Sequence, residues 1–228
     1  MSASHPSAHD LRRGDSLLSA RAKEMGRAML APVVRLAMRL HLTANTVTVL
    51  GFLIVAVAAI LVGTGNLLAG AAVLVAGSLL DAVDGSLARA TGGTTAFGSF
   101  LDSTLDRAAE ALLYGGVAAH YLTTAAEPTG PVLLALVAMA GSFMVSYTRA
   151  RAEGIGVSAT IGLAPRMERL VLLLAGILLA GLGLDIGLIG AIGVIAALSV
   201  ATTIQRIWHV HQLSTAGPRP AASETTRE

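Results

Sequence analysis

Four aspartates lie in the segment DAVDGSLARATGGTTAFGSFLDSTLD, residues 81–106 of a chain that is 54% hydrophobic and only 13% charged. Asp81 and Asp84 are one helical turn apart, as are Asp102 and Asp106, so on helices each pair would face one side. Four carboxylates in apolar surroundings are costly unless something neutralises their charge. One or two divalent cations would do so, and all-oxygen ligands favour Mg²⁺ or Mn²⁺.

The alternative is a set of interhelical ion pairs between these aspartates and arginines. In the neighbouring sequence only Arg89 and Arg107 offer positive charge, and Glu110 adds another acid. Because acids outnumber bases in this segment, a metal site is the stronger prediction.

Small residues accompany the aspartates at helical spacing. Gly85 and Gly98 are expected on the same helix faces as the carboxylates, with Ala88 in a similar position, so a bulky ligand can approach the backbone. Arg89 follows Gly85 by one turn and can meet a phosphate group at the membrane surface.

The low share of charged residues is typical of an integral membrane protein, since soluble domains carry about 25%. A membrane-spanning helix needs roughly 20 apolar residues. We therefore predict an all-α fold with six transmembrane helices, at about 43–63, 66–90, 96–122, 131–152, 163–183 and 187–210. The absence of cysteine excludes disulfides and thiolate metal sites.

The ends of the chain differ from this apolar middle part. Residues 17–40 alternate basic and apolar positions and predict an amphipathic interfacial helix, bent at Pro32, although a disordered basic tail is the alternative. No secretory signal peptide is expected. We predict a flexible tail at 1–16, one membrane domain over 17–212 with its spans in 43–212, and a disordered tail at 213–228.

The sixteen Lys and Arg residues avoid 40–88, 108–148 and 170–205. They gather before the first predicted span, beside the second-to-third and fourth-to-fifth connections, and from the end of the last span onward. By the positive-inside rule, both termini and the acidic segment face the cytoplasm, in a multi-pass protein of the inner cell membrane.

The acidic segment resembles the CDP-alcohol phosphotransferase family, whose pattern is D-x2-D-G-x2-A-R-x8-G-x3-D-x3-D. Every spacing is kept here, with the fixed positions at Asp81, Asp84, Gly85, Ala88, Arg89, Gly98, Asp102 and Asp106. The segment LTANTVT at 42–48 is similar to the L-T-P-N-x-V-T that opens the first span in many members, with Ala44 in place of Pro. Asn45 and Thr48 can then reach the nucleotide, but a helix cap by Thr43 or Asn45 is the simpler interpretation.

This resemblance implies a phosphatidyltransferase that binds the diphosphate of CDP-diacylglycerol on two Mg²⁺ or Mn²⁺ ions. A hydroxyl of a small alcohol attacks the β-phosphorus, and CMP leaves. By the same resemblance Asp81, Asp84 and Asp102 hold the metals, and Asp106 takes the hydroxyl proton and can touch a metal. Gly85, Ala88 and Arg89 help to hold the cytidine diphosphate, with Gly98 beside them.

The acceptor alcohol is suggested by a second set of residues. SYTRARAEG at 146–154 is similar to the S-Y-x-K-A-R-A-E of bacterial phosphatidylinositol phosphate synthases, with Arg149 at the Lys position. The resemblance implies inositol 1-phosphate as acceptor, its phosphate bound by Arg149, Arg169, Arg206 and Ser146. Glycerol 3-phosphate, as in phosphatidylglycerol phosphate synthases, is the near alternative, and membrane topology alone also explains these arginines.

Two further expectations concern partners. The glycine repeats in 176–193 suit close helix packing, within the chain or across a homodimer, and the family usually dimerises. The partners expected are therefore CDP-diacylglycerol, an anionic alcohol, membrane lipids and a second copy, with no nucleic acid. A cation transporter is the remote alternative, disfavoured because the carboxylates cluster at one end of their spans.

Overall fold

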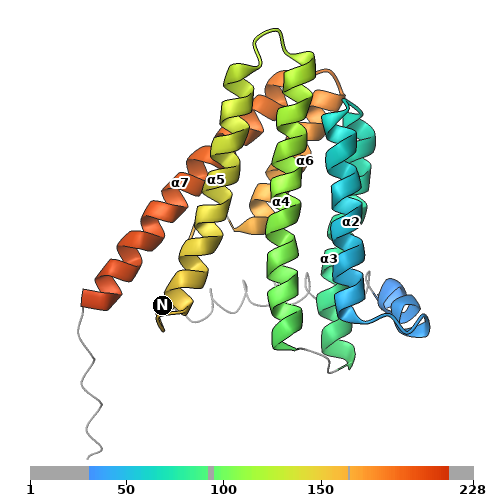
Figure 1. The fold of residues 1–228 in the computed structure, drawn as a ribbon, viewed down its shortest axis with the longest axis vertical. Coiled ribbons are helices and arrows are strands. Elements are labelled where there is room, and N and C mark those ends of the chain that lie inside the picture. Colours follow the sequence, from blue (N-terminus) through green and yellow to red (C-terminus); the bar gives the residue numbers. More distant parts are fainter. Residues whose placement is uncertain (1–30, 92–94, 164, 216–228) are drawn as a thin grey trace, which may run out of the picture. The chain divides into compact units, whose positions relative to one another are not determined.

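The computed structural model describes residues 31–91, 95–163 and 165–215, and within these ranges all regular secondary structure is helical. The labelled helices are α2 (Ala44–Gly63), α3 (Leu67–Thr91), α4 (Ala96–Thr124), α5 (Thr129–Glu153), α6 (Arg166–Gly181) and α7 (Asp185–Thr215) (Figure 1). The predicted all-α class is confirmed. Each predicted span falls on one of these helices, and α7 continues past the expected end at residue 210 as far as Thr215.

Four helices in the described ranges are long and apolar enough to cross a membrane, namely α2, α3 over Leu67–Arg89, α5 and α7. This agrees with a membrane protein but gives fewer candidates than the six predicted spans. Helix α6 has only 16 residues. Helix α4 has 29 residues but carries four charges in its first half, at Asp102, Asp106, Arg107 and Glu110.

The chain divides into two compact units, and the division passes through α2, α3 and α4. The first unit comprises residues 1–53 and 76–105. It contains the start of α2, the end of α3 and the first ten residues of α4. The second unit comprises residues 54–75 and 106–228.

A short helix at residues 31–39 completes the described part of the first unit. Its Val34 and Ala37 are buried, one turn apart, against Val47, Val83 and Leu87 of α2 and α3. Residues 31–39 of the predicted interfacial segment 17–40 are thus helical, with one side buried and with Val33, Leu36 and Met38 exposed. The rest of that helix and the tail at 1–16 lie outside the described residues, as do the Gly92-Gly93 turn and residues 216–228.

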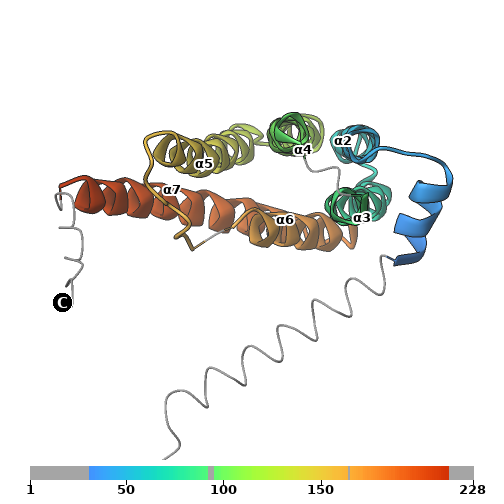
Figure 2. The same cartoon turned by 90° about the horizontal axis from the view of Figure 1, so that it is seen from below.

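Glycines allow close helix packing in the second unit. A Cβ on Gly116 of α4 would lie 2.4 Å from the carbonyl oxygen of Ala59 in α2, and one on Gly176 of α6 would lie 2.6 Å from the Cβ of Ala191 in α7. Helix α7 packs on both α5 and α6, as Figure 2 shows. Since Gly176 and Gly187 both face neighbours in the same chain, packing within the chain accounts for part of the glycine repeat.

Candidate active site

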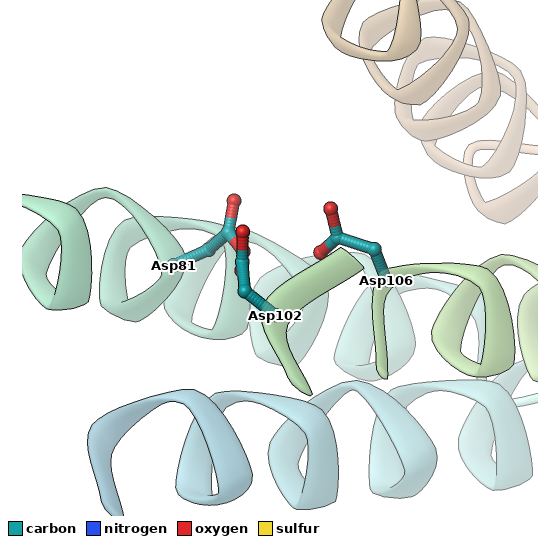
Figure 3. Close-up of side chains that lie close together, drawn as sticks. All are labelled: Asp81, Asp102 and Asp106. Atoms are coloured by element: carbon teal, nitrogen blue, oxygen red, sulfur yellow. The ribbon is translucent and has the colours of Figure 1, made fainter. Parts of the chain in front are cut away.

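Three of the four predicted aspartates come together. Asp81 of α3 and Asp102 and Asp106 of α4 each offer a carboxylate oxygen, and these oxygens lie within 4.8 Å of one another. Asp102 and Asp106 are one turn apart on α4, and Figure 3 shows the three side chains on one side of the helices that carry them. We call Asp81, Asp102 and Asp106 the acidic cluster. The three side chains are half-buried.

The fourth aspartate, Asp84, is not a member of this group of three. Its side chain is only 7% exposed, and its Oδ2 accepts a hydrogen bond of 2.7 Å from the hydroxyl of Thr48. Thr48 also donates to the carbonyl of Ala44 on its own helix. Thr48 therefore orients Asp84. The cap of α2 is Thr43, whose Oγ1 accepts from the backbone N–H of Thr46.

Two glycines of the motif leave room beside polar side chains of the first unit. A Cβ on Gly98 would lie 3.0 Å from Oδ1 of Asn45 and from Oγ1 of Thr95, so a larger residue here would require these side chains to shift. A Cβ on Gly85 would lie 3.4 Å from Nη1 of Arg89, whose Nη2 donates to the hydroxyl of Ser86. The side chain of Asn45 thus lies close to Gly98, and the guanidinium of Arg89 lies close to Gly85. Ala88 is half-buried one residue before Arg89.

Asp106 has arginines on both sides. Nη2 of Arg166, the first residue of α6, lies 2.6 Å from Oδ1 of Asp106, and Nη2 of Arg107 lies 3.5 Å from Oδ2. Asp106 therefore does form ion pairs with arginines, as the alternative prediction proposed. Its shorter contact is with Arg166, which lies sixty residues away and outside the segment whose charges were compared.

Glu110 lies at the centre of a second ion-pair network. The network joins α4 and α6 inside the second unit. Arg169 donates to Oε1 of Glu110 from Nε at 3.2 Å and from Nη2 at 2.8 Å. The other carboxylate oxygen lies 3.3 Å from Nη1 of Arg107. Arg169 is 1% exposed and Glu110 is 6% exposed, so this pair is shielded from solvent, whereas the side chain of Arg107 is 28% exposed.

The other predicted acceptor residues have different surroundings. Arg206 is buried, and its guanidinium donates to the carbonyls of Ile161 at 2.8 Å and of Val145, so it holds the α5–α6 connection against α5. Arg149 is exposed and pairs with Glu153 one turn along α5, at 2.9 Å. Ser146 accepts a hydrogen bond from Arg107.

Arg107, Glu110 and Arg166 are charged residues of the site to which the sequence pattern assigned no role. Nothing in the local spacing reveals their partners, because Glu110 and Arg169 are 59 residues apart. The available signal was an acid on the predicted face of Asp102 and Asp106, two turns beyond Asp102.

Comparison with known proteins agrees with this geometry. The family model described as CDP-alcohol phosphatidyltransferase matches residues 41–205. An archaetidylinositol phosphate synthase of Methanothermobacter thermautotrophicus is 41% identical over 186 residues, which cover 79% of this chain and 92% of the relative. A phosphatidylinositol phosphate synthase of Corynebacterium glutamicum is 33% identical over 212 residues, covering 92% and 94%.

Solved structures show the same relationship. The phosphatidylinositol phosphate synthase of Mycobacterium tuberculosis with CDP-DAG bound aligns with a TM-score of 0.77 and 31% identity, covering 86% of this chain and all of that one. The same enzyme in complex with manganese and citrate aligns with a TM-score of 0.75 and 32% identity, covering 84% and 93%.

Proposed function

Because the chain belongs to the CDP-alcohol phosphatidyltransferase family, we propose that it transfers a phosphatidyl group from CDP-diacylglycerol to inositol 1-phosphate and releases CMP. The observation that carries this proposal is the acidic cluster, which gathers three carboxylates from the family motif within 4.8 Å. The protein is thus a transferase of phospholipid synthesis, and its donor is a nucleotide-linked lipid.

The donor set of the acidic cluster fits a divalent cation. Three carboxylate oxygens this close repel one another, and hard oxygen ligands suit Mg²⁺ and Mn²⁺. We assign Asp81, Asp102 and Asp106 to the metal, and Asp84, whose carboxylate is oriented by the hydroxyl of Thr48, is the fourth proposed ligand. When bound, one or two such ions supply positive charge that polarises the diphosphate.

The side chains around the cluster account for the remaining steps. Asp106 takes the proton of the acceptor hydroxyl while the hydroxyl oxygen bonds to the β-phosphorus. The bond between the β-phosphorus and the oxygen that leaves with CMP breaks in the same step. Arg166 keeps the Asp106 carboxylate in place through its 2.6 Å contact. Gly85, Ala88, Arg89, Gly98, Asn45 and Thr48 hold the cytidine diphosphate side of the donor.

We further assign the acceptor phosphate to the arginine-rich part of the second unit. Arg149 and Arg169, with Ser146, supply the binding groups, and Arg206 supports them by fixing the carbonyl of Ile161 in the α5–α6 connection. Guanidinium groups bind phosphate in a planar, two-pronged way.

The proposed membrane arrangement has more spans than the four helices that are long and apolar enough by themselves. We infer that α4 and α6 also cross the membrane and that residues 31–39 end an interfacial helix. Both termini and the site then face the cytoplasm, in one membrane domain over 17–212 that forms a homodimer.

Cysteine labelling tests this orientation. Because the chain has no cysteine, a single introduced cysteine is a clean probe. Glu127→Cys is expected to react with an impermeant maleimide from outside the cell, and Ile155→Cys only after permeabilisation; the reverse pattern would overturn this orientation.

An acceptor screen tests the proposed reaction. Purified protein with CDP-diacylglycerol and Mg²⁺ is given inositol 1-phosphate, free inositol, glycerol 3-phosphate or serine, and CMP release is measured. The proposal expects turnover with inositol 1-phosphate, and none after chelation of the metal. A preference for glycerol 3-phosphate would overturn the acceptor and leave the reaction class standing, whereas no CMP release with any alcohol would overturn the reaction.

A further inference from the structure

Glu110 is a buried carboxylate with an arginine on each oxygen. Its Oε1 receives both Nε and Nη2 of Arg169, and its Oε2 faces Nη1 of Arg107 at 3.3 Å. Glu110 is only 6% exposed, so water contributes little to the solvation of its carboxylate. All three residues belong to the second unit, and Glu110 is outside the family motif that carries the acidic cluster.

Stability alone is a weak reason for such an arrangement. A buried ion pair rarely stabilises a fold more than apolar side chains of the same shape, because both charges lose their hydration. A network of charges does, however, fix the direction of each guanidinium. Two donors of Arg169 meet one oxygen of Glu110, which sets the plane of that guanidinium.

The other arm of the network reaches the reacting end of the site. Arg107 lies between Glu110 and Asp106, 3.5 Å from the latter, and also donates to the hydroxyl of Ser146. Ser146 in turn donates to the carbonyl of Ser142 on α5. Glu110 therefore holds Arg169, a proposed acceptor ligand, by two hydrogen bonds, and it attracts Arg107, which contacts the proposed base, through an ion pair.

We propose that Glu110 is a positioning residue for the acceptor alcohol, which it places by holding Arg169 and Arg107 in fixed orientations. The inference rests on the proposed function, since it assigns Arg169 to the acceptor phosphate. Glu110 itself does not touch the substrate. Its role is to keep two guanidiniums where a phosphate and the Asp106 carboxylate require them.

The length of the side chain gives the test. Glu110→Asp keeps the charge, so Arg169 retains a counter-ion, but draws the carboxylate back by one methylene. Displacements of this size in a positioning group can cost about a hundredfold in activity. We expect the acceptor KM to rise roughly tenfold or more, with the KM for CDP-diacylglycerol changing by less than about twofold.

Two further variants test the role of the charge and serve as a control for the shortened side chain. Glu110→Gln removes the charge and is expected to raise the acceptor KM further and to lower the thermal midpoint, because Arg169 is left buried beside a neutral amide. Glu127→Asp makes the same shortening at an exposed site between α4 and α5 and is expected to change neither KM.

A binding readout separates this inference from the proposed function. Inositol 1-phosphate and, separately, CMP are added without donor lipid, and the rise in thermal midpoint is measured. Loss of the inositol 1-phosphate shift in Glu110→Asp, with the CMP shift intact, supports the positioning role even if no CMP is released in the transfer assay. Equal loss of both shifts, or unchanged acceptor binding in a folded Glu110→Asp protein, would overturn it.

Discussion

Asp84 and Arg169 are both charged and both almost fully buried, yet their surroundings differ. Asp84 has a threonine hydroxyl as hydrogen-bond donor, and its neighbouring charges, Asp81 and Asp102, have the same sign. Arg169 pairs with Glu110, which also meets Arg107. Around Asp84 the acidic region thus gathers like charges that a cation can join, with arginine partners at Asp106, whereas the carboxylate of Glu110 balances the charge of Arg169 before any substrate binds.

This difference predicts separate consequences for the two regions. Substitutions in the acidic region are expected to act on metal dependence and on the chemical step. In the arginine region, substitutions at Arg149 and Arg169 are expected to act on acceptor binding, and those at Arg206 on folding.

The largest effect is expected at Asp106. Asp106→Asn removes the proposed base and a metal ligand, and we expect CMP release to fall by about 10²–10⁴-fold with the fold intact, as measured by circular dichroism. Asp185→Asn, an exposed aspartate in the first turn of α7, is the matched control and is expected to keep its activity. Near-normal turnover by Asp106→Asn would remove that residue as the base.

Arg206→Met tests the structural side of the arginine region. The substitution leaves the carbonyls of Val145 and Ile161 without their charged donor, so we expect the free energy of unfolding to fall by about 2–3 kcal/mol. Thermal unfolding in detergent, followed by circular dichroism, measures this loss. An unchanged midpoint would show that the α5–α6 connection does not depend on Arg206.

A smaller effect is expected at Thr48. Thr48→Val removes the hydroxyl that orients Asp84, and groups that orient metal ligands typically change metal affinity by about 10–100-fold. We expect the Mg²⁺ concentration for half-maximal activity to rise about tenfold. Thr64→Val is the control. The hydroxyl of Thr64 donates to the carbonyls of Ile60 and Leu61 and accepts from the side-chain amide of Asn66, and an equal response of both variants would contradict an orienting role.

The smallest change in stability is expected at Arg149. Its ion pair with Glu153 is about half exposed on both sides, and such pairs within a helix contribute about 0.3–0.5 kcal/mol. Arg149→Gln should therefore unfold at nearly the wild-type temperature while its acceptor KM rises. A normal acceptor KM would indicate that membrane topology alone explains this arginine.

The sequence was sufficient for the features that depend on local spacing. Runs of apolar residues placed the six helices, and the intervals between Asp81, Asp102 and Asp106 placed three carboxylates together. The end of α7 at Thr215 was missed because the polar residues after 210 continue a helix without a breaker until Gly217.

Partners in distant segments were not predictable. In the sequence, Arg166 and Arg169 are equally consistent with positive charges at a cytoplasmic loop. Only the structure shows that Arg166 pairs with Asp106 and Arg169 with Glu110. Asp84 was expected beside the other three aspartates, and its hydrogen bond with Thr48, 36 residues earlier, was not. Pattern and spacing define a helix face, but not which residue of another helix approaches it.

Crystals grown with Mn²⁺ and CMP, measured at the manganese absorption edge, test the central claim most directly. The account predicts an anomalous peak among the carboxylates of Asp81, Asp102 and Asp106, next to a nucleotide phosphate, and no peak there in Asp102→Asn. A nucleotide bound away from these carboxylates, with no manganese between them, would contradict it.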